Sequence, residues 1–186
     1  EDGAYYLNGA TTNAQLLAVN RESDWKWAIT SEDEWYKAAY HKNDGVTGNY
    51  FNYPTSSDSV PGRDLSDASG NNANYYGSPS PIDSPYYTTV AGEFQNSDSP
   101  YGTFDQGGNV WEWNEAVLYG SYRGLRGGSF SLNDYYLLAS GRYHYFPSDE
   151  YDSIGFRVSE VPEPGTMALL AFGGIGVLRR RRGLRR

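Results

Sequence analysis

His144, within residues 142–146, is the side chain whose type could serve as a general base in this sequence. Imidazole exchanges protons near neutral pH, but a base needs a neighbouring group to activate. No serine or carboxylate pair accompanies it in a recognisable arrangement, so the sequence favours a structural role. His41 follows a predicted helix, where contact with the helix dipole is expected. The acidic run at 149–152 is typical of a solvated face rather than of a metal site.

The sequence contains no cysteine, which excludes disulfides, thiolate metal sites, iron–sulfur clusters and a cysteine nucleophile. Two histidines are too few for a multi-histidine zinc or copper site. Residues 1–160 hold nine basic and 22 acidic side chains, a formal charge of −13, whereas 161–186 hold six arginines and one glutamate. Because the acidic residues 1–160 would repel the phosphates of a nucleic acid, no nucleic-acid partner is expected.

The composition indicates a loop-rich fold. A length of 186 residues fits one domain, or a small domain with tails. The chain has 18 Tyr, 7 Phe, 5 Trp, 22 Gly and 9 Pro. This mixture is typical of irregular structure held together by aromatic packing rather than of a helical bundle.

The clearest predicted helix covers residues 30–42, where Ser31 and Glu34 have the spacing of a capping box. Residues 43–106 are rich in Gly, Asn, Ser, Asp and Pro and are expected to be mostly loop. So long a loop needs buried aromatic side chains or bound cations to order it. Short strands are predicted at residues 88–90, 108–113, 122–126, 137–142 and 155–159.

Residues 161–186 form a separate module. It opens on a step that excludes a helix, Val161, Pro162, Glu163 and Pro164. The uncharged run 165–178 is short for a span of about 20 residues, but flanking arginines can snorkel. Those arginines are Arg179, Arg180, Arg181 and Arg182. A buried core helix is the alternative, which four adjoining arginines disfavour. We predict a single transmembrane helix at about 165–178, the Arg-rich end 179–186 in the cytoplasm and residues 1–160 outside.

The proline step, the short apolar run and the arginine cluster, in this order, resemble the PEP-CTERM sorting signal of exported bacterial proteins. The resemblance implies export, docking at the membrane and processing by an exosortase-type protease near the Pro-Glu-Pro step. The expected location is the membrane, the cell surface or the extracellular matrix. Glu163 would then be a recognition residue and not a catalyst.

Five further elements resemble, in order, the C-terminal part of the formylglycine-generating enzyme (sulfatase-modifying factor) family. They are ITSEDEWYKAA at 29–39, NY at 74–75, GGNVWEW at 107–113, LRGGSF at 125–130 and GFR at 155–157. The resemblance covers roughly residues 25–160 and implies an α+β fold related to C-type lectins, with little regular structure. The family's N-terminal portion is not visible and no signal peptide opens the sequence. We therefore expect residues 1–160 to be an N-terminally incomplete domain.

The resemblance also indicates a missing activity. Enzymes of the family oxidise a substrate cysteine with copper held by two cysteines that follow the Gly-Gly-Ser-aromatic element. Aligned on that element, this sequence has Leu132 and Leu137 at the two positions. Leucine neither binds copper nor exchanges disulfides. A branch that uses non-haem iron takes most of its histidines from a partner domain. We therefore expect no copper and no oxidase activity.

The resemblance still implies calcium as a cofactor. The family's ligands map onto the side chains of Asp105 and Glu112 and the carbonyls of Gly108 and Val110. Calcium accepts six to eight oxygens, backbone carbonyls included. The alternative is that Asp105 caps a turn and Glu112 pairs with an arginine such as Arg126. A second family site maps onto Asn74, Tyr75 and Asp83.

Three functions remain open. The first is a non-catalytic, exported surface protein that binds a glycan or protein ligand, since the region between Phe130 and Tyr151 is rich in Tyr, Ser, Asn and Asp. The second is an enzyme of the family whose active-site residues are unrecognised or lie elsewhere. The third is a structural component of the envelope or exopolysaccharide matrix.

Overall fold

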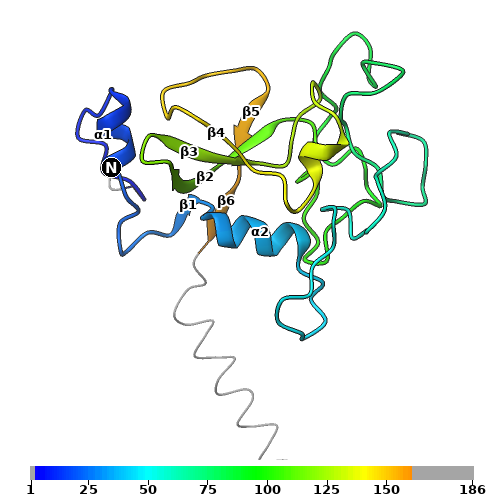
Figure 1. The fold of residues 1–186 in the computed structure, drawn as a ribbon, viewed down its shortest axis with the longest axis horizontal. Coiled ribbons are helices and arrows are strands. Elements are labelled where there is room, and N and C mark those ends of the chain that lie inside the picture. Colours follow the sequence, from blue (N-terminus) through cyan, green and yellow to red (C-terminus); the bar gives the residue numbers. More distant parts are fainter. Residues whose placement is uncertain (1–2, 161–186) are drawn as a thin grey trace, which may run out of the picture.

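The computed structural model describes residues 3–160, which fold around a small mixed sheet (Figure 1). The elements in chain order are α1 (Asn13–Ala18), β1 (Trp27–Ile29), α2 (Glu32–Tyr40), β2 (Trp111–Leu118), β3 (Tyr122–Arg126), the 3-10 helix η1 (Asp134–Leu137), β4 (Tyr143–Tyr145), β5 (Ile154–Phe156) and β6 (Val158–Glu160). Four strands form one sheet in the order β4-β3-β2-β5, in which β2 and β5 are parallel and the other neighbours antiparallel. β1 and β6 form a separate antiparallel pair.

Helix α2 starts at the predicted capping box. The Glu34 amide donates to Ser31 Oγ over 3.2 Å, and the Ser31 amide donates to Glu34 Oε2 over 2.7 Å. The helix buries Trp35, Ala39 and Tyr40, which form one cluster of the core. Hydrogen bonds between residues three positions apart therefore fix the N-terminus of α2. The burial of two large aromatic rings stabilises the body of the helix.

The long segment between α2 and β2 contains neither helix nor strand of more than a single bridge. Tyr53 and Ala73 anchor it in a second core cluster with Leu137. Buried amides order the rest of the segment: Asn72 is 3% exposed, its main-chain amide donates to Ser97 Oγ over 2.8 Å, and its side chain binds further loop atoms. Buried aromatic side chains were predicted to order this loop, and the structure adds a network of polar side chains.

The strand predictions had mixed outcomes. Strand β3 matches residues 122–126, whereas residues 155–159 divide into β5 and β6. Residues 88–90 form no strand, because the Asn109 side chain binds both main-chain groups of Thr89. The strand predicted at 137–142 is also wrong: η1 ends there and a turn follows, in which the Gly141 amide donates to Leu138 O.

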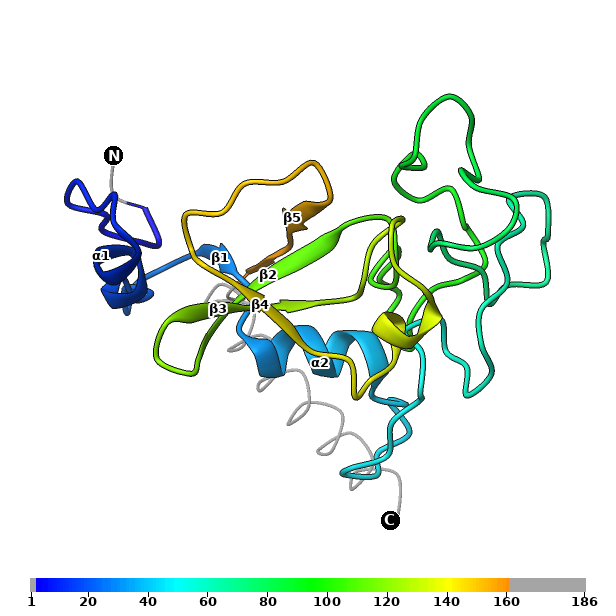
Figure 2. The ribbon, with the colours of Figure 1, turned by 45° about the horizontal axis from the view of Figure 1, so that its top comes forward.

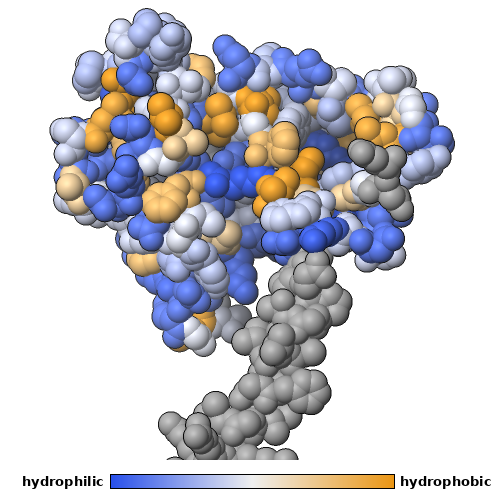
Figure 3. All heavy atoms as spheres, turned by 180° about the vertical axis from the view of Figure 1, so that it is seen from behind, coloured by the Kyte–Doolittle hydropathy of each residue, from blue (hydrophilic) through white to orange (hydrophobic). Residues whose placement is uncertain are grey.

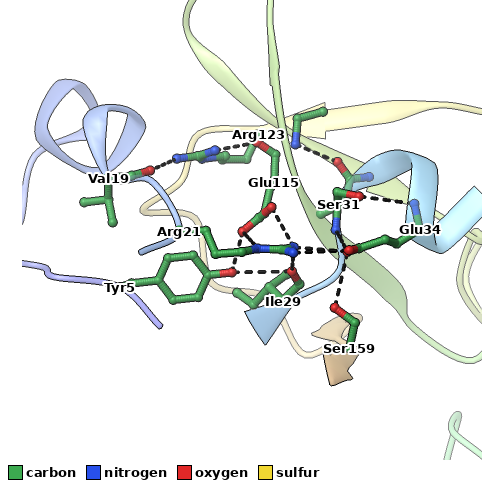
Figure 4. A network of polar contacts seen from close by, with 11 residues as sticks. Tyr5, Val19, Arg21, Ile29, Ser31, Glu34, Glu115, Arg123 and Ser159 are labelled. Carbon is green, nitrogen blue, oxygen red and sulfur yellow. Dashed lines mark hydrogen bonds and ion pairs between the residues drawn. The ribbon is translucent and has the colours of Figure 1, made fainter. Parts of the chain in front are cut away.

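Residues 4–22, here called the N-terminal loop, lie at one end of the sheet, and the long irregular segment lies at the other (Figures 1 and 2). The loop closes where Tyr5 pairs with Arg21 in an isolated bridge. Arg21 binds Glu34 over 3.1 Å and Glu115 over 2.8 Å, and the Tyr5 hydroxyl donates to Glu115 over 2.6 Å (Figure 4). The loop thus belongs to the folded domain.

The N-terminal loop is expected to loosen in acid and in strong base. Burial alone would raise the pKa of Glu34, but the hydrogen bonds and charge of Arg21 outweigh it and lower this pKa from 4.5 to about 2. The stabilisation from Glu34 is therefore present above about pH 4.5 and is lost as the pH falls toward 2. Burial and the bond to Glu115 raise the pKa of Tyr5 to about 12, so its stabilisation is lost as the pH rises from 10 toward 12.

Amide chemical shifts of the N-terminal loop, followed by NMR as a function of pH, would measure this loosening. Glu34→Gln should remove the acid step, and the exposed Glu150→Gln should leave it in place. Loop shifts that stay constant between pH 5 and pH 2 would contradict the assignment.

On the face shown in Figure 3, apolar side chains form separate small patches among hydrophilic ones. Between residues 3 and 160, no helix is both long and apolar enough to cross a membrane. The predicted transmembrane helix at 165–178 and the sorting residues of the module 161–186 lie outside the described residues.

Candidate functional site

The first predicted calcium ligands lie in the loop before β2 and at the start of that strand. Asp105 has a φ of 57°, and its Oδ2 accepts a hydrogen bond from the Gly92 amide over 2.5 Å. Asp105 therefore caps the turn that contains Gly92. Gly108 has a φ of 77°, and a Cβ there would lie 2.1 Å from Asn74 O, so the position requires glycine. Val110, the other predicted carbonyl ligand, directly precedes β2 and is half-buried.

Glu112 is the most deeply buried acid of this group, at 5% exposed. Its Oε2 accepts hydrogen bonds from Trp35 Nε1 over 2.6 Å and from Arg157 Nε over 2.7 Å. Burial raises the pKa of Glu112, the charge of Asp105 adds to the rise, and Arg157 opposes it. The hydrogen bonds converge on Oε2, and Arg157 supplies a positive charge at this carboxylate. Within residues 3–160, no three side chains of His, Asp or Glu gather to hold a metal, so this set offers two carboxylates and two main-chain carbonyls.

The alternative considered from the sequence, that Asp105 caps a turn and Glu112 pairs with an arginine, is confirmed, but the arginine is Arg157 and not Arg126. Glu112 and Arg126 are direct cross-strand partners in the β2–β3 register. Arg126 instead turns toward α2 and binds Glu32 Oε1 over 2.6 Å, while Arg157 approaches Glu112 from the β5–β6 junction. The β2–β3 register places Arg126 opposite Glu112, but tertiary packing pairs Glu112 with Arg157.

The second predicted calcium set is occupied by protein contacts. Asn74 is 2% exposed and its Nδ2 donates to Tyr87 O over 2.9 Å and to Asn109 Oδ1 over 3.1 Å. The Tyr75 carbonyl accepts a hydrogen bond from Arg63 Nε over 2.7 Å, which puts a cationic group beside a predicted cation ligand. Asp83 lies half-buried in the adjoining loop. Both predicted sets therefore hold an arginine beside a predicted cation ligand, Arg63 at Tyr75 and Arg157 at Glu112.

The two leucines at the family's cysteine positions have different environments. Leu137 is 0% exposed and packs in the core cluster of Tyr53 and Ala73. Leu132 is half-buried, and its carbonyl accepts a hydrogen bond from the Tyr76 amide over 2.8 Å. Both side chains are saturated hydrocarbon and can only pack.

A continuous set of aromatic rings follows the edge strand β4. Ring centroids lie 4.6 Å apart for Tyr122 and His144 and for Tyr122 and Phe146, and 5.1 Å apart for Tyr119 and His144. Tyr119 is 82% exposed and Phe146 is 40% exposed. We call this set the β4 aromatic surface; it comprises Tyr119, Tyr122, Tyr143, His144, Tyr145, Phe146 and Tyr151. His144 is a member of a ring stack here.

Two functional features escaped the sequence analysis. The β4 aromatic surface joins the predicted aromatic region 130–151 to rings at the β2–β3 turn, which only the strand pairing brings together. The attachment of the N-terminal loop through Arg21 and Arg123 was also missed.

Comparison with protein families finds two matches. Residues 5–161 match the sulfatase-modifying factor enzyme 1-like domain, and residues 160–182 match the PEP-CTERM protein-sorting motif. The domain match begins about 20 residues earlier than expected. The expectation that residues 1–160 hold only the C-terminal part of the domain is therefore not confirmed. The docking of the N-terminal loop onto Glu34 and Glu115 gives the physical reason.

Three solved structures share the fold. Variable protein 1 of Treponema denticola has 22% identity and a TM-score of 0.56, and the alignment covers 82% of this chain and 54% of that one. CarF has 21% identity and a TM-score of 0.55, with 78% and 52% covered. PvdO from Pseudomonas aeruginosa has 22% identity and a TM-score of 0.50, with 73% and 53% covered. This chain thus spans about half the length of each. No curated protein sequence matches it.

Proposed function

Because the chain belongs to the sulfatase-modifying factor enzyme 1-like domain family, we propose that it is a non-catalytic member that binds a glycan or protein ligand through the β4 aromatic surface. The sorting motif at 160–182 indicates export and a cell-envelope or surface location. The observation that carries the binding proposal is the group of packed rings along β4 and the β2–β3 turn, of which Tyr119, Tyr143, Phe146 and Tyr151 are exposed. Aromatic faces offer large, rigid contact area at low entropic cost.

The negative charge of the domain limits the chemical classes of ligand that it is expected to bind. Residues 1–160 carry a formal charge of −13, and the β4 aromatic surface borders the acidic run at 149–152. An anionic polysaccharide would be repelled. We therefore expect an uncharged sugar chain, or a neutral or basic protein, and the row of rings favours the sugar.

Removing two rings should weaken ligand binding by about tenfold or more, since each aromatic contact contributes roughly 0.5–1.5 kcal/mol beyond its buried area. Tyr119→Ala with Phe146→Ala removes two exposed members of the surface. Tyr86→Ala with Val90→Ala is the matched control, because these side chains are 69% and 68% exposed and lie in another loop. Glycan-array and pull-down screens with the full chain would identify the ligand, and calorimetry would measure the affinities. Equal losses in both double variants would contradict the proposal, as would screens that return no ligand.

The non-catalytic part of the proposal rests on Leu132 and Leu137. The alternative is a family enzyme, an oxidoreductase, that uses other residues. An assay for aldehyde formation on a cysteine-bearing peptide separates the two, and turnover by the purified full chain would support the enzyme.

We also propose that an exosortase-type protease recognises the motif at 160–182 during export and that the apolar run 165–178 holds the chain at the membrane.

Calcium is proposed as a structural ion at Asp105, Gly108, Val110 and Glu112. Calcium sites of extracellular modules have dissociation constants of roughly 10⁻⁴–10⁻³ M, so millimolar calcium should raise the melting temperature. Asp105→Asn should abolish this rise, and Asp83→Asn should preserve it, because the second set already binds Arg63. Thermal melting with calcium and with a chelator measures both. A melting temperature that does not respond to calcium would rule the ion out, and a rise lost in Asp83→Asn would assign it to the other site.

A further inference from the structure

A cavity of about 530 Å³ lies between the N-terminal loop and the sheet. The loop contributes Leu7, Leu16 and Val19 to its wall, and Ile29 of β1 and Trp113 of β2 lie on the side of the strands. Sites for small molecules are typically concave, mainly apolar and roughly 300–1,000 Å³ in volume. The cavity meets these criteria, and neither Glu112 nor a ring of the β4 aromatic surface lines it, although Trp113 and Pro147 of its wall directly follow Glu112 and Phe146 in the sequence.

Polar contacts attach the N-terminal loop to the strands. α1 has no fully buried residue, so apolar packing does not seat it. Arg123 of β3 instead donates from Nη2 to the carbonyls of Leu16 and Val19 over 3.2 and 2.8 Å (Figure 4). At the base of the loop, Arg21 binds Glu115. Leu16 and Val19 are half-buried and Leu7 is 54% exposed, so these apolar side chains line a space instead of packing, and they lack the dispersion contacts that a ligand would supply.

The charges in the wall are already satisfied. Arg21 is paired with Glu34 and Glu115, and Arg123 is bound by main-chain carbonyls. A charged ligand would have to displace one of these partners, so the cavity favours an uncharged one.

One polar group of the wall is unused. Asn114 is 2% exposed, and its Oδ1 accepts a hydrogen bond from the Ala116 amide over 3.0 Å, which fixes the orientation of its side-chain amide. Within residues 3–160, its Nδ2 has no hydrogen-bond partner. This nitrogen has less than 1 Å² of surface accessible to water, so it is unpaired inside the fold and a ligand in the cavity does not reach it.

We propose that the cavity beneath the N-terminal loop binds an uncharged, mainly apolar small molecule. The molecule lies between the loop and Trp113. This site is independent of the ligand bound by the β4 aromatic surface.

The test uses prodan, an uncharged naphthyl ketone whose emission shifts to the blue when it leaves water. Prodan should bind the full chain saturably, and Leu16→Trp, which fills the cavity, should weaken binding by about tenfold or more. Ala14→Trp is the matched control, because Ala14 lies exposed on the same helix and does not line the cavity; it should change the affinity by less than about twofold. Saturating prodan should also raise the melting temperature of the wild type and of Ala14→Trp, but not that of Leu16→Trp.

Three results would overturn the proposal. The first is an absence of saturable binding. The second is equal binding by all three proteins, which would place the dye on the apolar run 165–178 or on another surface. The third is an equal loss of affinity in both tryptophan variants. Circular dichroism of each variant confirms that α1 and the sheet remain folded, so that a loss in Leu16→Trp reports on the cavity.

Discussion

Replacing Glu112 with alanine is expected to lower the free energy of unfolding by about 3–5 kcal/mol, the usual cost of removing one partner of a buried ion pair. Glu112 is 5% exposed and accepts hydrogen bonds from the Trp35 indole and the Arg157 guanidinium. The substitution leaves both donors without their acceptor. Because it joins α2, β2 and the β5–β6 junction, Glu112 connects segments that are far apart in the sequence.

Urea unfolding of the full chain, in the presence of a calcium chelator, measures this loss without any contribution from bound metal. Glu112→Gln is the matched variant, since it keeps an acceptor for Trp35 and loses only the charge that faces Arg157. Its loss should be smaller than that of Glu112→Ala. A loss of less than about 1 kcal/mol in Glu112→Ala would mean that the pair behaves like an exposed one.

Replacing Arg126 with methionine is expected to cost about 3 kcal/mol, because it breaks a buried pair and leaves main-chain acceptors empty. The guanidinium binds Glu32 over 2.6 Å and the carbonyls of Ala139 and Gly141 over 2.9 and 2.6 Å. These contacts fix the turn that leads into β4. Arg126→Met should therefore also weaken ligand binding by the β4 aromatic surface.

Arg142→Met is the control for Arg126→Met. Arg142 binds the same carboxylate, that of Glu32, but its side chain is 42% exposed against 10% for Arg126. An exposed pair contributes roughly 0–1 kcal/mol, so the control should lose little stability. Chemical denaturation of the two variants provides the comparison. Losses of equal size would show that burial does not govern these two contacts.

Local features of the chain were predictable because they depend on neighbours in the sequence. The capping box of Ser31 and Glu34 needs residues three positions apart, and it begins α2 as expected. The order of the motifs was sufficient to find both matching families, and the absence of cysteine alone excluded thiolate chemistry.

Pairings between distant residues were not predictable from one sequence. Arg126 and Arg157 both lie within reach of acids, and only the placement of α2 against the sheet assigned Glu32 to the first and Glu112 to the second. The N-terminal loop carries a weak apolar pattern, yet its arginine clamps make it part of the domain and enclose a cavity. Propensities and caps act over three or four residues, whereas a buried charge selects its partner from every segment that folding brings near it. The sequence therefore determined the family, the sorting signal and the absence of cysteine. Tertiary packing decided which charges pair, which rings line β4 and where the fold leaves space.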